Sequence, residues 1–61
     1  MTEFYIYTTD RGGLWLDADE HTWTTHFTNA ASFTSAELAK DVAERETGGN
    51  ITVTYVLGWA A

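Results

Sequence analysis

The chain has 61 residues, and its nine acidic residues outnumber its three lysines and arginines, giving a formal net charge of −6 at pH 7. This charge argues against direct binding of nucleic acid, because lysine and arginine are needed there to neutralise phosphates. The absence of cysteine excludes disulfides and thiolate metal sites. We expect residues 1–61 to form one small domain, in which three residues each of Trp, Tyr and Phe supply much of the buried area.

The first elements in the chain are predicted to form a β-hairpin. Residues 3–9 (EFYIYTT) and 14–18 (LWLDA) are rich in aromatic and β-branched residues, which is typical of strands. A loop of Asp10, Arg11 and Gly12, with Gly12 left-handed, gives the preferred register, and Gly12 is expected to tolerate alanine less well than Gly13. The expected cross-strand pairs are Thr8–Leu14, Ile6–Leu16 and Phe4–Ala18 on one face, and Tyr7–Trp15 and Tyr5–Asp17 on the other. A two-residue loop would place Ile6 opposite Asp17 and lose a core position.

Residues 19–29 (DEHTWTTHFTN) are polar with isolated aromatic residues, and they predict a long connection with a turn near Asp19. We expect Trp23 and Phe27 to lie over one end of the core. Residues 29–32 are expected to form a single helical turn, and residues 32–33 a very short strand.

Residues 34–49 carry helical periodicity and predict one amphipathic helix. Thr34 and Glu37 have the spacing of a capping box, and Gly48 with Gly49 can close the helix in the left-handed conformation. The apolar side is expected to comprise Ala36, Leu38, Ala39, Val42 and Ala43, with Leu38 and Val42 as its main core anchors. The opposite side carries the acidic residues Glu37, Asp41 and Glu44.

Residues 50–57 (NITVTYVL) predict the last strand, which we expect to join the sheet beside the first strand. The fold class is therefore α+β: a two-layer sandwich in ββ(β)αβ order, with a three- to four-stranded sheet and one amphipathic helix on one face. One face of the last strand is expected to carry Ile51, Val53, Tyr55 and Leu57, and the other Thr52, Thr54 and Val56. The helix is expected to cover the sheet face bearing Phe4, Ile6, Leu14, Leu16, Ile51 and Val53.

Two surfaces are candidates for binding a protein partner. Tyr5, Tyr7 and Trp15 are expected on the sheet face away from the helix, and such residues commonly anchor protein interfaces. The alternative is local packing, in which Trp23, Phe27 or Trp59 folds over them. The acidic helix side, Glu37, Asp41 and Glu44, is suited to a basic partner surface, although such stripes commonly serve only solubility.

Possible metal ligands gather in the polar connection: Asp17, Asp19, Glu20, His21 and His26. This stretch lacks the glycine and the terminal glutamate of a calcium loop, so a solvated acidic loop is the ordinary interpretation. No serine or threonine has a base and an orienting acid nearby in sequence, and the glycine pairs lack the pattern of a phosphate-binding loop. We expect no catalytic residue, metal or cofactor; a small metal-dependent enzyme is the least favoured hypothesis.

A further pattern leads from the hairpin into the helix: Trp23-Thr24, Ala30 or Ala31, Phe33, and Thr34-Ser35 with Glu37. It resembles a loose group of small proteins encoded by bacteriophages and prophages, although the Asp-Glu-His stretch before Trp23 and the low lysine content depart from that group. The group has no general assigned activity. The resemblance, together with the small size, the acidity and the aromatic sheet face, leads us to expect a phage accessory protein that binds and modulates a host protein in the host cytoplasm; the alternative is a self-associating structural phage protein. No apolar run is long enough for a membrane span, so we expect no membrane association.

Overall fold

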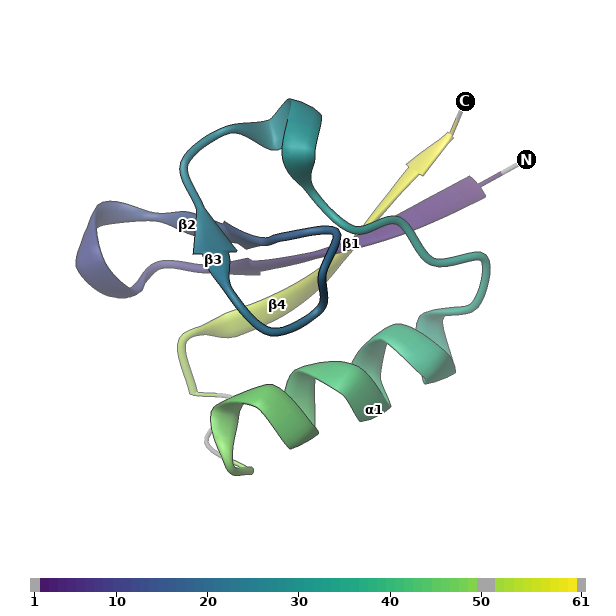
Figure 1. Ribbon diagram of the computed structural model, residues 1–61. Coiled ribbons are helices and arrows are strands. Elements are labelled where there is room, and N and C mark those ends of the chain that lie inside the picture. The colour runs from purple at the N-terminus through teal and green to yellow at the C-terminus, as the bar shows by residue number, and fades with distance from the viewer. Residues whose placement is uncertain (1, 50–51, 61) are drawn as a thin grey trace.

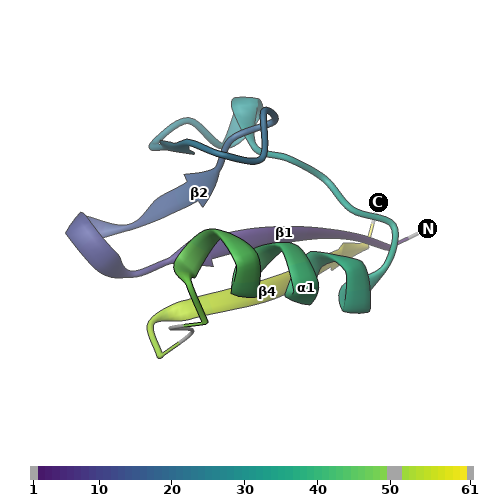
Figure 2. The same cartoon turned by 60° about the horizontal axis from the view of Figure 1, so that its bottom comes forward.

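The structure is a computed structural model that describes residues 2–49 and 52–60. It has the predicted α+β fold, with one helix on one face of an antiparallel sheet in the order β3-β2-β1-β4 (Figures 1 and 2). The elements are β1 (Thr2–Thr8), a 3-10 turn (Asp10–Gly12), β2 (Leu14–Leu16), β3 (Trp23–Thr24), a second 3-10 turn (Phe27–Asn29), α1 (Ala36–Thr47) and β4 (Thr54–Ala60). The last strand therefore lies beside the first, as predicted.

The first hairpin has the predicted register where its two strands pair. Tyr7 faces Trp15, Thr8 faces Leu14, and the Gly13 N–H closes the turn by donating to the Asp10 carbonyl over 3.1 Å. Gly12 has a φ of 86°, as the predicted loop requires. The expectation that Gly13 is the more tolerant glycine is wrong, because Gly13 also has a positive φ of 106° and a Cβ there would overlap the Tyr7 hydroxyl.

Beyond Leu16 the two strands of the hairpin separate, and residues 30–33 fill the space between them. Phe4 and Phe33 exchange backbone hydrogen bonds of 2.8 and 2.9 Å, and the Ala31 N–H donates to the Leu16 carbonyl over 2.9 Å. Asp17 forms a bridge with Ala30. The predicted pairs Phe4–Ala18 and Tyr5–Asp17 are therefore wrong, because this later segment takes the strand edges that they need. The predicted Ile6–Leu16 pair continues the observed register but lies beyond the two pairs that the ladder contains, and both side chains are buried.

The hydrophobic core lies between the sheet and α1. Its buried members are Ile6, Leu16, Ala31, Phe33, Ala39, Val42 and Ala43, with Phe4, Trp23 and Val56 packed against them. Val56 pairs with Ile6 and shares its face, so the faces predicted for the last strand are reversed. The register in which β4, starting at Thr54, pairs with β1 determines which of its side chains point inward. The alternation of residue types within β4 does not determine this. Ile51 lies outside the described residues.

The helix begins one residue later than the predicted cap. The Ser35 hydroxyl, not that of Thr34, accepts the Leu38 N–H over 3.3 Å, so the predicted capping box is wrong. Gly48 ends the helix with a left-handed φ of 66°, as predicted. Val42 is buried with 6% of its surface exposed, but Leu38 is 52% exposed and is not a core anchor. The other buried residues of the helix are the small side chains of Ala39 and Ala43.

The connection between β2 and the helix differs from the prediction in two further details. Trp23 packs against the core as expected, but it does so from a two-residue strand, β3, that the polar sequence around it did not indicate. The helical turn covers Phe27–Asn29 rather than residues 29–32. Phe33 makes the predicted short strand contact, as a single bridge to Phe4.

Candidate functional site

The sheet face away from α1 carries a cluster of aromatic side chains. Tyr7 and Trp15 are cross-strand neighbours with ring centroids 4.7 Å apart, and Tyr5 meets Trp15 edge-on at 6.4 Å. The structure therefore brings together the three aromatic residues that the sequence singles out. Alternation along β1 and β2 places them on this face, because Ile6 and Leu16 occupy the opposite, buried side.

Phe27 packs on this cluster from the second 3-10 turn. Its ring lies 4.8 Å from that of Tyr5, 4.9 Å from that of Trp15 and 6.1 Å from that of Trp59. Tyr5, Tyr7 and Trp15 are consequently half-buried. Local packing, the alternative considered from the sequence, thus accounts for part of the cluster, while Phe27 itself remains 41% exposed.

Strand β4 extends the aromatic surface to the edge of the sheet. Tyr55, Leu57 and Trp59 are 49%, 38% and 60% exposed, and they lie beside β1 because Tyr7 pairs with Tyr55 and Tyr5 with Leu57. From the sequence, Tyr55 and Leu57 were expected on the core-facing side of the last strand, and Trp59 lay beyond the strand predicted for residues 50–57, so none of the three was proposed as part of a binding surface. The signal that could have found them is the alternation of large apolar residues from 55 to 59. We call the whole surface the aromatic face: Tyr5, Tyr7, Trp15, Phe27, Tyr55, Leu57 and Trp59.

A carboxylate borders the aromatic face. The Tyr5 hydroxyl donates a hydrogen bond to Glu3 Oε2 over 3.0 Å. This hydrogen bond, helped by desolvation and by the negative charge of Glu3, raises the pKa of Tyr5 above its ordinary value. The phenol therefore stays neutral and fixed at the rim, where it supplies a polar boundary to an otherwise apolar surface.

The acidic helix residues do not belong to the same surface. Glu37, Asp41 and Glu44 are exposed on α1, which covers the opposite face of the sheet (Figure 2). None of the three takes part in an ion pair between described side chains. The residues predicted to bind a partner thus divide into two groups on opposite sides of the molecule, and one flat partner surface cannot contact both.

The carboxylates of the polar connection are used within the fold. Asp19 accepts hydrogen bonds from the backbone N–H groups of His21 and Thr22, at 2.8 and 2.9 Å, and from the Thr22 hydroxyl at 2.9 Å. These bonds, led by that from His21, lower the pKa of Asp19. Within residues 2–49 and 52–60, no group of three or more His, Cys, Asp or Glu side chains is placed to hold a metal ion. The role of Asp19 that the structure supports is to fix the loop.

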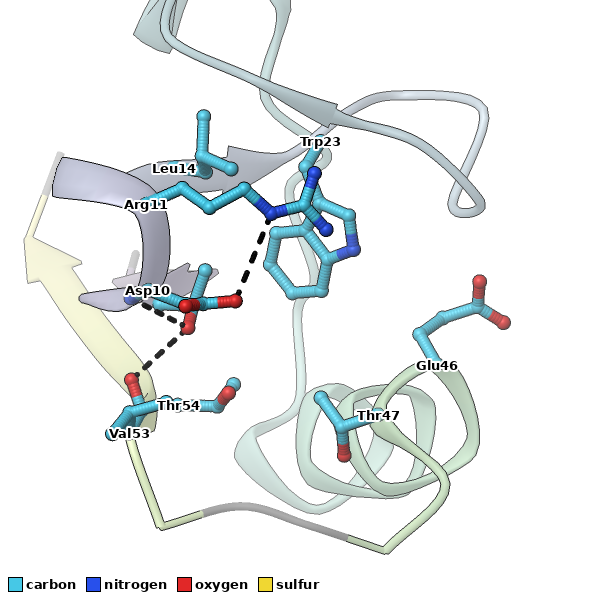
Figure 3. A pocket seen from close by; sticks show the side chains of 9 residues that line it. Asp10, Arg11, Leu14, Trp23, Glu46, Thr47, Val53 and Thr54 are labelled. Atoms are coloured by element: carbon cyan, nitrogen blue, oxygen red, sulfur yellow. Dashed lines mark hydrogen bonds and ion pairs between the residues drawn. The ribbon is translucent and has the colours of Figure 1, made fainter.

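A small pocket of about 210 Å³, with both polar and apolar residues in its lining, lies between the hairpin turn and the end of α1. Figure 3 shows Asp10 and Arg11 across the pocket from Glu46 and Thr47, with Trp23 between them. The Thr8 hydroxyl donates to the Val53 carbonyl and accepts the Asp10 N–H, each over 3.2 Å. The pocket is below the roughly 300 Å³ at which typical small-molecule sites begin.

The charged groups around this pocket are mutually engaged. Glu46 accepts a hydrogen bond from Arg45 Nε over 2.9 Å and lies 3.2 Å from His21 Nδ1, and Arg11 lies 3.8 Å from Asp10. The bond from Arg45 is the largest cause of the lowered pKa of Glu46. The arrangement therefore fastens the helix end to the polar connection, and the aromatic face is the stronger candidate for a functional site.

None of the helices in the described part of the chain is long and apolar enough to cross a membrane. Comparisons of the chain with protein-family models, with curated proteins and with solved structures found no match in any of the three. The class defined by fold and surface is a small α+β protein with an apolar, aromatic sheet face, and arguments about its function rest on that geometry.

Proposed function

We propose that this protein is a non-catalytic protein-binding module whose aromatic face is the contact surface. The observation that carries the proposal is the set of large apolar side chains exposed on one side of a very small fold: Phe27, Tyr55, Leu57 and Trp59. Contiguous exposed apolar surface of this kind usually marks an interaction site. Tyrosine and tryptophan are also the residues that most often dominate binding energy at protein interfaces.

The packing beneath the exposed rings supports the same proposal. Phe27 rests on Tyr5 and Trp15, so its ring is held in position before a partner arrives. Prepositioned aromatic side chains lose little conformational entropy on binding, which leaves more of the contact energy for affinity. A partner would therefore present an apolar patch, with Phe27 and Trp59 as its principal contacts.

Charge suggests the wider character of the partner. The chain carries a net charge of −6, and the exposed carboxylates of Glu37, Asp41 and Glu44 add to its long-range negative field. Such a field speeds encounter with a positively charged protein even when the carboxylates do not touch it. Together with the resemblance to phage-encoded proteins, this leads to a phage accessory protein that modulates a basic host protein in the host cytoplasm.

Capture of partners from a bacterial host lysate tests the proposal. Immobilised wild-type protein is expected to retain a specific partner, and Phe27→Ser is expected to lose it. Leu38→Ser is the matched control, because Leu38 is also an exposed large apolar residue but lies on the helix, away from the aromatic face. Retention of the same partner by Phe27→Ser, or absence of any protein that distinguishes the two variants, would contradict the proposal.

Self-assembly is the second candidate function. The observation that favours it is the position of β4, which lies at the end of the sheet and pairs on one side only within the described chain.

A further inference from the structure

Strand β4 presents an open edge along its whole length. It pairs with β1 from Thr54 to Ala60, and no other described strand lies on its outer side (Figure 1). The backbone N–H and C=O of Phe4 bond to Phe33, away from β4, so Phe4 and its partner Gly58 form a pair without mutual hydrogen bonds. Because such pairs alternate along an antiparallel ladder, the outward-facing backbone groups of β4 belong to Thr54, Val56, Gly58 and Ala60.

This edge lacks the features that usually prevent strand addition. Proteins protect open edges with lysine, proline, bulges or short strands. Strand β4 has seven residues, TYVLGWA, with no charged residue and no proline, and its pairing with β1 is continuous. Although 20% of the residues in the chain are charged, none of them lies on this open edge, so the edge is suited to pairing with an added strand.

We propose that the edge of β4 pairs with β4 of a second copy, antiparallel and centred on Leu57. In this alignment Val56 faces the partner's Gly58 and Thr54 faces the partner's Ala60, so every outward backbone group of β4 gains hydrogen bonds. Leu57 faces the partner's Leu57, and Tyr55 faces the partner's Trp59, on the aromatic face. The sequence of β4 is thus self-complementary, as a two-fold symmetric interface requires.

The side chains fit this alignment as well as the backbone does. Tyr55 and Trp59 are the two most exposed aromatic residues of the described chain, and each would lie directly opposite the other across the two-fold axis. Aromatic pairs directly opposite one another are among the favourable cross-strand contacts. On the helix-facing side of the sheet, Val56 lies opposite the partner's Gly58. Because Gly58 has no side chain, it leaves room on that side for the two helices.

The small core explains why a second copy is the expected occupant rather than a transient peptide. Three of the buried core residues are alanines: Ala31, Ala39 and Ala43. Domains of this size can fold alone but with little stability to spare, and an oligomeric interface is one of the means by which small proteins gain stability. Disulfides are excluded because the chain has no cysteine, and a lasting interface along β4 would add apolar burial to this small core.

Charge predicts how the dimer responds to salt. Each copy carries −6, so the two copies repel, and added salt is expected to tighten the dimer by screening that repulsion. An apolar groove of about 430 Å³ runs beside β4, and Lys40 of α1 lines it. Lys40 forms no ion pair with another described residue, so it offers one positive charge to the acidic partner copy at this boundary.

A charge-swap experiment tests the proposed register. Because residue 57 faces itself across the two-fold axis, Leu57→Lys alone and Leu57→Glu alone each place like charges opposite one another and are expected to be monomers. Mixing the two folded variants is expected to restore a one-to-one heterodimer, with a mass twice that of the chain by light scattering. Wild-type protein and the control Leu38→Lys are expected to remain dimers.

Several outcomes would overturn the proposal. These are a wild-type protein that is monomeric at about 1 mM, a Leu57→Lys variant that dimerises as tightly as Leu38→Lys, or a mixture of folded charge variants that stays monomeric. If the lysine variant does not fold, a synthetic chain with N-methylglycine at position 58 replaces the outward backbone N–H by an N-methyl group. This removes the donor and blocks the close approach of a second strand, so the chain is expected to be a folded monomer. The dimer is independent of the proposed binding function. If the wild-type protein is monomeric, and Phe27→Ser still abolishes capture of the host partner, then the dimer is wrong and the binding function stands.

Discussion

The hydroxyl of Tyr7 occupies the space in which a side chain on Gly13 would begin. Gly13 has a φ of 106° and a ψ of 117°, a conformation that is strained for any residue with a Cβ. Tyr7 in turn packs against Trp15, with ring centroids 4.7 Å apart and ring planes inclined at 55°. The contact between the Tyr7 hydroxyl and Gly13 thus joins the hairpin turn to the aromatic face.

The first prediction is that Gly13→Ala destabilises the protein more than Gly12→Ala does. Backbone strain of this kind costs about 1–3 kcal/mol, and the overlap with Tyr7 adds to it. Gly12 also has a positive φ, but a Cβ there would meet open space. Urea denaturation of both variants measures the difference. Adding Tyr7→Phe to Gly13→Ala is expected to recover part of the loss, and equal stability of the two glycine variants would contradict the account.

The second prediction concerns the helix face. Val42→Ala is expected to lower the free energy of unfolding by about 2 kcal/mol, because it leaves a cavity in the core. Leu38→Ala is expected to change it by less than about 0.5 kcal/mol, because that side chain is largely in solvent. Thermal unfolding of the two variants gives the ranking. A larger loss for Leu38→Ala would mean that the helix is rotated relative to the sheet.

The third prediction concerns the start of the helix. Ser35→Ala removes the hydroxyl that accepts the Leu38 N–H and is expected to cost about 1 kcal/mol. Thr34→Ala is the matched control and is expected to have little effect, since Thr34 lies outside the cap. The comparison needs only chemical denaturation of both variants, and a greater loss for Thr34→Ala would restore the capping box expected from the sequence.

The fourth prediction concerns pH. The pKa values of Asp19 and Glu46 are lowered in the folded protein, mainly by hydrogen bonds from His21 and Arg45 respectively. Their contribution to stability is therefore present above the carboxyl pKa of the unfolded chain, near pH 4, and is lost as pH falls through the lower folded values. Melting temperature measured from pH 7 to pH 2 is expected to fall in the acid range. Asp19→Asn with Glu46→Gln is expected to flatten that fall; an unchanged acid profile would contradict it.

The sequence correctly predicted those elements that depend on residues close together in the chain, such as tight turns and the end of the helix. The turn from Asp10 to Gly13 fixed the register of Tyr7 with Trp15, and Gly48 marked the end of the helix correctly. The insertion of residues 30–33 beside Phe4 was not predictable in the same way. Phe4 and Phe33 both lie in segments predicted as strands, but their pairing depends on backbone hydrogen bonds between residues far apart in the chain, and no local pattern specifies it.

The same distinction explains what was found and missed in the candidate site. Tyr5, Tyr7 and Trp15 were placed correctly because the hairpin register settles their face. Tyr55 and Leu57 were assigned to the wrong face because an alternating strand gives its period but not its phase. Their phase follows from the register of the pairing with β1; the sequence predicted that the two strands are neighbours but not that register.

The most direct test of the aromatic face as a binding surface is the affinity of the captured partner for purified variants. Phe27→Ser and Trp59→Ser are each expected to weaken binding by at least about tenfold, which corresponds to about 1.4 kcal/mol. Leu38→Ser is expected to bind within about twofold of wild type, since its side chain is exposed on the helix. Equal affinity of all three folded variants would contradict the aromatic face as the contact surface.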